Sequence, residues 1–188
     1  RKTSAVRTLG HAALQWPLHL LAAAYPDRAD CKRLGCLIAV RQGRQFTYDM
    51  LRQCFTLALL RRHLDLSPPD ECNLVIGDGF GVMSSLLLLH APERKTIVAN
   101  LTKPLLLDLI YASRAVPSLR WALVSGPDEL TEALDDPDVS LIAVRADDVS
   151  ALAGAPIGLA VNIVSMLEMD PPVIIKYFRL LRNNKAKQ

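Results

Sequence analysis

Apolar residues recur at helical spacing through the first seventy positions of the chain, so the sequence predicts an N-terminal helical region. Ser4 and Thr47 are helix-capping residues placed just before two of these segments, and Gly43 ends another. Pro17 falls inside the first segment and predicts a kink or a split there, because proline removes a backbone hydrogen bond. The predicted helices cover residues 5–25, 29–40 and 48–64.

The pattern changes after a proline-rich link at residues 67–70. Short, mostly apolar runs that carry apolar residues on both faces, as in buried strands, now alternate with helical segments. The predicted strands are 73–76, 96–99, 121–124, 140–144 and 159–164, and the predicted helices are 82–90, 103–115, 128–134 and 171–182. This alternation predicts an α/β fold, a parallel sheet with helices on both faces. We therefore expect a helical region over 1–69 and an α/β domain over 70–188.

Composition places the chain among folded globular proteins. It has 188 residues, of which 51% are hydrophobic and 22% are charged, so it can bury a sizeable core. The net charge of +3 is too small to predict the dense basic surface of a nucleic-acid-binding protein. No apolar stretch reaches the ~18 residues of a membrane span, and the first residues lack the apolar core of a signal peptide. We therefore expect a cytoplasmic protein without a membrane span.

The most informative stretch is a glycine-rich turn between the first predicted strand and the following helix. Gly77, Gly79 and Gly81 alternate with other residues, and a helix begins directly behind them. Glycine allows a sharp turn and a close approach to a ligand, and a helix N-terminus offers free N–H groups. The dinucleotide-binding fingerprint needs its third glycine at position 82, which is Val82. The observed spacing is the form found in methyltransferases that bind S-adenosylmethionine, and a tight turn without a ligand is the alternative.

Two blocks of sequence carry a resemblance to a known family. The first is the glycine block 76–81 with the strand and leucine-rich helix that follow it, up to Tyr111. The second contains Asn162, Ser165-Met166 and Glu168-Met169, followed by a helix with Tyr177-Phe178. With these blocks the chain resembles bacterial S-adenosylmethionine-dependent sugar O-methyltransferases over about residues 72–181. The resemblance implies a Rossmann-like core and transfer of a methyl group to a hydroxyl of a sugar or nucleotide sugar.

The resemblance also implies a set of cofactor-binding residues. The glycine turn would hold the methionine part of S-adenosylmethionine, Asn100 the ribose, and Asp147 or Asp148 the adenine amino group. The residues expected at the cofactor are Gly77, Asp78, Gly79, Phe80, Gly81, Asn100, Leu101, Asp147, Asp148, Asn162 and Ser165. The two aspartates at 147 and 148 are equally explained as loop carboxylates or a helix cap, and Asn162 and Ser165 as side chains that hold the backbone. No Cys or His spacing predicts a metal site.

Glu168 is the candidate catalytic residue. It follows the last predicted strand, at the carboxyl edge where open α/β sheets bind ligands. Sugar hydroxyls are weak acids, so a carboxylate here could orient or deprotonate the acceptor. The alternative is that Glu168 caps the helix that begins at Pro171.

Two departures from the family leave rival functions open. The family has an acidic residue at the position of Val75 and an aspartate at that of Asn100. Its core also has about seven strands, whereas five are predicted here, so we expect the C-terminal strands to be missing from the chain. The alternatives are a non-catalytic methyltransferase-like interaction module and a dinucleotide-binding oxidoreductase. The expected partners are a small-molecule or glycan acceptor and a second copy of the chain, bound through the N-terminal helices.

Overall fold

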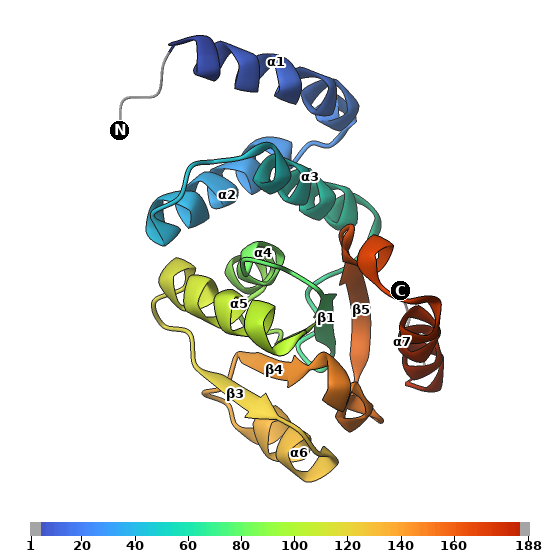
Figure 1. Cartoon of the computed structure of the whole chain (residues 1–188). Helices are drawn as coiled ribbons and strands as arrows, with labels where there is room; N and C mark the ends of the chain where they lie inside the picture. The colour runs from blue at the N-terminus through green and yellow to red at the C-terminus, as the bar shows by residue number, and fades with distance from the viewer. Residues whose placement is uncertain (1–4, 185–188) are drawn as a thin grey trace. The chain divides into compact units, whose positions relative to one another are not determined.

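The structure is a computed structural model that describes residues 5–184 (Figure 1). It divides into two compact units, one that ends at Leu66 and one that begins at Ser67. The division falls at the start of the proline-rich link at 67–70, where proline and the polar residues around it favour an irregular connection.

The first unit is helical. Its elements are α1 (Ala5–Leu21), the short 3₁₀ helix η1 (Ala22–Ala24), α2 (Arg28–Gln42) and α3 (Tyr48–His63). The side chain of Thr47 accepts a hydrogen bond from the Met50 N–H at 3.2 Å, which confirms the predicted cap of α3. Gly43 ends α2 in the left-handed conformation, with φ of 67°. Helix α1 continues through Pro17, so the chain does not split there, and the kink stays a prediction.

The second unit contains a sheet of five strands, all parallel to their neighbours. The strands are β1 (Cys72–Ile76), β2 (Thr96–Asn100), β3 (Trp121–Val124), β4 (Leu141–Arg145) and β5 (Ile157–Asn162). Their order is β3-β4-β2-β1-β5. The register aligns Ile76 with both Ala99 and Asn162, and Asn100 with Arg145. The carboxyl ends of four strands therefore meet along one edge of the sheet, which confirms the predicted α/β fold and brings their loops together.

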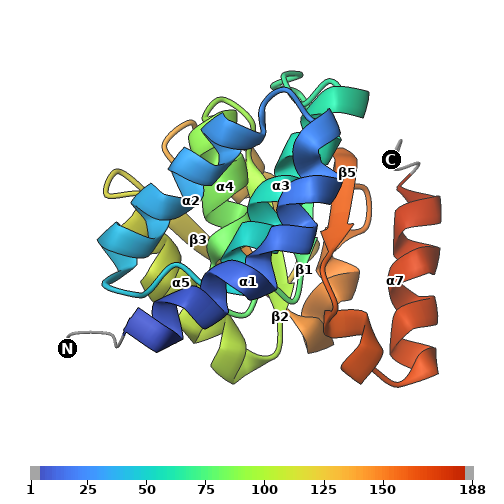
Figure 2. The ribbon, with the colours of Figure 1, turned by 90° about the horizontal axis from the view of Figure 1, so that it is seen from above.

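Helices cover both faces of this sheet (Figures 1 and 2). The covering elements are α4 (Val82–His90), α5 (Thr102–Ala115), α6 (Pro127–Asp135), the 3₁₀ helix η2 (Ala146–Leu152) and α7 (Pro171–Asn183). Alternate residues of one strand point to opposite faces: Val98 packs with α4 and α5, whereas Ile97 and Ala99 pack with α6, η2 and α7. Figure 2 shows α7 running beside β5. None of the helices within residues 5–184 has the length and hydropathy needed to cross a membrane.

The last strand differs from its prediction in position. The apolar pattern extends to residue 164, whereas β5 ends at Asn162. Val164 has φ of 76° and ψ of −32°, which lies outside the extended region, so the chain turns away from the sheet here. The chain then forms the 3₁₀ helix η3 (Ser165–Glu168) and enters α7. This early turn places the segment after β5 over the sheet edge.

Candidate functional site

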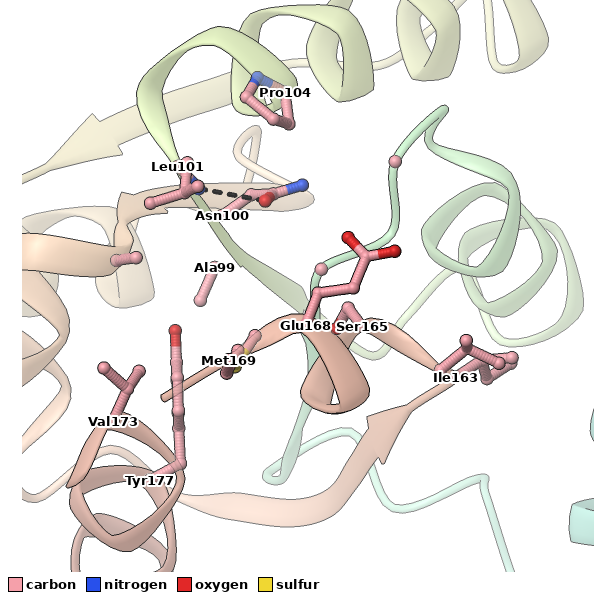
Figure 3. A pocket seen from close by; sticks show the side chains of 14 residues that line it. Ala99, Asn100, Leu101, Pro104, Ile163, Ser165, Glu168, Met169, Val173 and Tyr177 are labelled. Atoms are coloured by element: carbon pink, nitrogen blue, oxygen red, sulfur yellow. Dashed lines mark hydrogen bonds between the residues drawn. The ribbon is translucent and has the colours of Figure 1, made fainter. Parts of the chain in front are cut away.

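A cavity of about 520 Å³ lies at the carboxyl edge of the sheet. This volume is within the range of small-molecule binding sites. It is lined by residues from the ends of β1, β2, β4 and β5 and from α7, and Figure 3 shows their side chains. The predicted site residues that line the cavity are Gly77, Gly79, Asn100, Leu101, Ser165 and Glu168. The sheet therefore brings together residues from four separate segments of the sequence.

The three glycines of the turn are required for different reasons. Gly77, Gly79 and Gly81 have φ of 71°, 82° and 61°, a conformation that L side chains disfavour. A Cβ at Gly77 would collide with Ser165 Oγ, and one at Gly81 would lie 2.5 Å from the carbonyl oxygen of Asp108. A Cβ at Gly79 would meet nothing within 4 Å. Packing therefore explains Gly77 and Gly81, whereas Gly79 leaves open space beside the cavity.

Asp78 closes the N-terminus of α4 and does not line the cavity. Its carboxylate accepts hydrogen bonds from the backbone N–H groups of Met83 at 2.9 Å and Ser84 at 2.8 Å, and from the Ser84 hydroxyl at 2.6 Å. Burial raises the pKa of Asp78, and the hydrogen bonds from Ser84 and Met83 oppose this increase. The N–H groups that the sequence suggested for a ligand are therefore bound to the protein's own carboxylate.

A second buried carboxylate, Asp108 of α5, lies behind the turn. Its Oδ1 accepts a hydrogen bond from the Gly81 N–H at 3.1 Å, and its Oδ2 accepts one from Asn100 Nδ2 at 2.8 Å. Burial and then the nearby Asp78 carboxyl raise the pKa of Asp108 to about 7. No local motif marks Asp108. It does lie on the apolar stripe that Leu105 and Leu109 form on α5, and a carboxylate on such a stripe is a sequence signal of a buried acid.

Asn100 connects Asp108 to the cavity. Its Oδ1 accepts a hydrogen bond from the Leu101 N–H at 2.9 Å (Figure 3), while its Nδ2 donates to Asp108. One amide hydrogen and one lone pair of Asn100 are thus left for a ligand. An aspartate at this position would place a further carboxylate against Asp108. An asparagine at this position avoids that repulsion, so the buried acid behind it gives a physical reason for a neutral side chain here.

Asn162 and Ser165 join the loop after β5 to the end of β1. Asn162 Nδ2 donates to the Ile76 carbonyl oxygen at 2.8 Å and to Ser165 Oγ at 2.5 Å, and Asn162 Oδ1 accepts from the Met166 N–H at 3.2 Å. Ser165 Oγ donates to the same Ile76 oxygen at 2.9 Å. These bonds favour the alternative to cofactor binding, in which Asn162 and Ser165 hold the backbone of the loop.

Val164 has a strained backbone at the rim of the cavity. It is the one non-glycine residue with positive φ in residues 5–184, and its β-branched side chain makes that conformation unfavourable. The Asn162–Ser165 network on either side of it fixes this turn. Strained residues of this kind cost about 1–3 kcal/mol and are concentrated at functional sites.

Replacing Val164 with glycine should relieve this strain. We expect Val164→Gly to stabilise the protein by about 1 kcal/mol, because the relief exceeds the entropy that glycine adds to the unfolded chain. The neighbouring Ile163→Gly has no positive φ to relieve and should destabilise the protein instead. Urea denaturation of both variants measures the difference, and equal destabilisation by the two would contradict the strain.

Glu168 provides the charge of the cavity. Among the 14 described residues that line it, Glu168 is the one acidic residue, and none is basic. Its side chain is exposed, and Figure 3 shows the carboxylate directed into the same space as the Asn100 amide. A cavity with one carboxylate and no basic side chain disfavours phosphate groups and favours a neutral or cationic ligand.

The remaining predicted residues lie outside the lining. Phe80 packs edge-on against Tyr111, with ring centroids 5.5 Å apart. Asp148 accepts a hydrogen bond from Arg145 Nε at 2.7 Å, which lowers the pKa of Asp148. Asp147 is exposed, and its carbonyl oxygen accepts a hydrogen bond from Lys176 at 3.4 Å. The structure therefore places both aspartates in the first turn of the 3₁₀ helix η2, outside the cavity lining and after its N-cap Arg145, so they are neither loop carboxylates nor the predicted cap.

Tyr177 lines the cavity but carries no sequence-based assignment. It comes from α7, its side chain is 1% exposed, and its hydroxyl has no hydrogen-bond partner among the described residues. Figure 3 shows the ring standing beside Val173 with the hydroxyl directed toward Ala99. A buried hydroxyl without a partner is costly, so a ligand that reaches the Tyr177 hydroxyl would gain a hydrogen bond that the described chain does not supply.

Comparisons with known proteins found no relative of this chain. No family model, no curated protein and no solved structure matches the chain.

Proposed function

We propose that the chain is an S-adenosylmethionine-dependent methyltransferase with a Rossmann-like core that acts on a hydroxyl of a sugar or nucleotide sugar. The charge of the cavity is the observation that carries the proposal. Glu168 is its charged group, and Asp78 and Asp108 already occupy N–H groups at the start of α4. This arrangement disfavours a dinucleotide pyrophosphate and suits a sulfonium cation. The acceptor class comes from the family resemblance.

The residues present fit S-adenosylmethionine. Gly79 offers open space for a close approach of the ligand to the backbone, and Asn100 offers one donor and one acceptor to a diol. Glu168 offers a negative charge to the sulfonium and ammonium groups. The adenine base would lie in the apolar part of the cavity, beside the small side chain of Ala99. The unpartnered hydroxyl of Tyr177 is the polar group there.

The chain's own contribution to the reaction is positioning, exclusion of water and movement of a proton. When bound, S-adenosylmethionine supplies an electrophilic methyl group. The sheet edge holds the ligand on strand ends that the Asn162–Ser165 network fixes. Glu168 accepts the proton that the acceptor hydroxyl loses, and its exposed position lets it pass that proton to water.

Calorimetry with several ligands tests the proposal. We expect S-adenosylhomocysteine to bind at micromolar strength, and NAD and inorganic phosphate not to bind. Tight NAD binding would favour the oxidoreductase instead, and absence of S-adenosylhomocysteine binding would reject the methyltransferase.

The charge of Glu168 gives a sharper test. S-adenosylmethionine carries a positive sulfur and S-adenosylhomocysteine does not, so Glu168→Gln should weaken the first several-fold more than the second. The effect is modest because the side chain is exposed to solvent. The exposed Asp170→Asn, which lies outside the cavity lining, is the control for loss of a negative charge. Equal weakening of both ligands by Glu168→Gln would contradict a sulfonium beside this carboxylate.

A non-catalytic methyltransferase-like module is the second candidate. The hydrogen bonds of Asn100 to Asp108 and Leu101 favour it, because they leave only part of the Asn100 amide for a ribose. Binding of S-adenosylhomocysteine without methyl transfer to any sugar would support this candidate.

A cytoplasmic location and a homodimer through the N-terminal helices stay predictions. The four cysteines are unpaired, as a reducing compartment favours.

A further inference from the structure

Tyr177 is the least explained group of the cavity. Its side chain is 1% exposed, and its hydroxyl is among the buried side-chain atoms without a hydrogen-bond partner within residues 5–184. Burial and then the negative charge of Asp147 raise the pKa of Tyr177, so the hydroxyl keeps its proton at neutral pH. A neutral phenol both donates and accepts a hydrogen bond. The fold thus buries a donor and an acceptor that nothing in the described chain uses.

The side chains near the hydroxyl are apolar, and the space that they line is here called the slot. Ala99 at the end of β2 and Ala146 after β4 line the cavity with small side chains, and Val173 lines it from α7. Figure 3 shows the Tyr177 hydroxyl directed toward Ala99, with Met169 between Tyr177 and Glu168. The hydroxyl end of the cavity is therefore apolar and the Glu168 end is charged. The small residues at these strand ends leave room for a ligand group beside the Tyr177 ring.

We propose that Tyr177 is a specificity-determining residue, whose hydroxyl forms a hydrogen bond with a ring nitrogen of an uncharged heteroaromatic base bound in this slot. The inference rests on the proposed function, because it takes the cavity as the cofactor site, and it adds the residue that recognises the base. A site built around a buried polar group rejects ligands that leave it unpaired. The slot should therefore distinguish a purine from an apolar ring of the same shape.

The position on α7 explains why the contact depends on the whole fold. Tyr177 and Leu180 are the buried residues of this helix, and both belong to the core between the sheet and the helices. The ring is thus held by packing, and the hydroxyl is fixed before a ligand arrives. A fixed donor loses little entropy on binding.

Calorimetry on Tyr177→Phe tests the inference, with adenosine and S-adenosylhomocysteine as ligands. We expect both to bind about tenfold more weakly than to the original chain, which corresponds to about 1.4 kcal/mol. The equal loss is expected because both ligands carry the base. The matched control is Tyr48→Phe, which removes the hydroxyl of a tyrosine on α3 that is 42% exposed and should change neither affinity.

Thermal denaturation without ligand separates recognition from structure. Because the hydroxyl has no partner in the described chain, Tyr177→Phe should unfold at the same temperature or a higher one. A clear decrease would show that the hydroxyl has a structural partner and would overturn the inference. If Tyr177→Phe binds the ligands more weakly but melts at the same temperature or a higher one, the hydroxyl acts only as a ligand contact.

Base analogues give a second test that needs no variant. Adenosines in which one ring nitrogen is replaced by CH should include one that binds the original chain about tenfold more weakly, and Tyr177→Phe should bind that analogue and adenosine equally. If every analogue binds like adenosine, the inference fails.

The outcomes distinguish this inference from the proposed function. If S-adenosylhomocysteine binds the original chain and Tyr177→Phe equally, the inference fails and the methyltransferase proposal stands. A loss for S-adenosylhomocysteine without a loss for adenosine also overturns it, because the contact would then lie away from the base. If neither ligand binds the original chain, the proposed function fails and the inference fails with it.

Discussion

Replacing Gly81 with alanine is expected to destabilise the protein by about 3 kcal/mol or more. The residue has φ of 61°, and an added Cβ would lie 2.5 Å from the Asp108 carbonyl oxygen and 3.0 Å from the Ala112 nitrogen. The left-handed conformation alone costs alanine about 1–2 kcal/mol, and the collision adds about 1–3 kcal/mol. Both neighbours are backbone atoms of α5, so they cannot move without displacing the helix. Urea denaturation measures the loss.

Gly79→Ala is the matched control for this prediction. It has a similar positive φ of 82° but no atom within 4 Å of the added Cβ, so only the conformational cost of about 1 kcal/mol is expected. The same variant should weaken S-adenosylhomocysteine binding, because the added methyl group enters the open space beside the cavity. If both variants lose the same stability, close packing of the turn on α5 does not explain Gly81.

The fold could be predicted from the sequence because its strands are buried on both faces. Runs such as 97–99 and 141–144 are apolar at every position, and a parallel sheet covered by helices buries such runs. The end of β5 was harder to place. Ile163 and Val164 continue the apolar pattern, but the backbone turns at Val164 because the Asn162–Ser165 bonds hold the chain to β1. That restraint joins residues 86 positions apart, so no local pattern contains it.

The site could be predicted only where its signal is local. The glycine turn places Gly77 and Gly79 at the cavity, as the spacing predicts, because both the turn and the strand before it are contiguous in sequence. Asp78 sits in the same motif, yet its carboxylate bonds to α4, which depends on how the turn folds back. Asp108 and Tyr177 reach the region of the site only through tertiary packing. The helical patterns around them predict that both side chains are buried, but they do not indicate a function.

The same buried acids also predict an unusual response to pH. Asp78 and Asp108 both have a raised pKa, and Asp108 reaches about 7 because it is buried and lies near the Asp78 carboxyl. Between the ordinary value of 3.8 and about 7, the folded chain holds a proton on Asp108 that the unfolded chain releases. The free energy of unfolding should therefore fall as the pH rises through this window. At about 1.4 kcal/mol per pH unit, Asp108 accounts for about 4 kcal/mol of the decrease at most, and Asp78 adds to it.

Asp108→Asn should remove the part of this decrease that Asp108 causes. Asparagine does not titrate, so the stability of the variant should change much less between pH 4 and pH 8 than that of the original chain. Its amide oxygen still accepts the Gly81 N–H, but its amide nitrogen replaces the oxygen that accepts from Asn100 Nδ2. That bond is lost at every pH, so the slope with pH is the diagnostic quantity. The exposed Asp135→Asn, at the end of α6, controls for the loss of one charge and should retain the original slope. Urea denaturation of the three proteins from pH 4 to pH 8 provides the comparison. If the free energy of unfolding of Asp108→Asn falls with pH as steeply as that of the original chain, another group releases the proton. Asp108 would then be an ordinary ionised carboxylate in the folded protein.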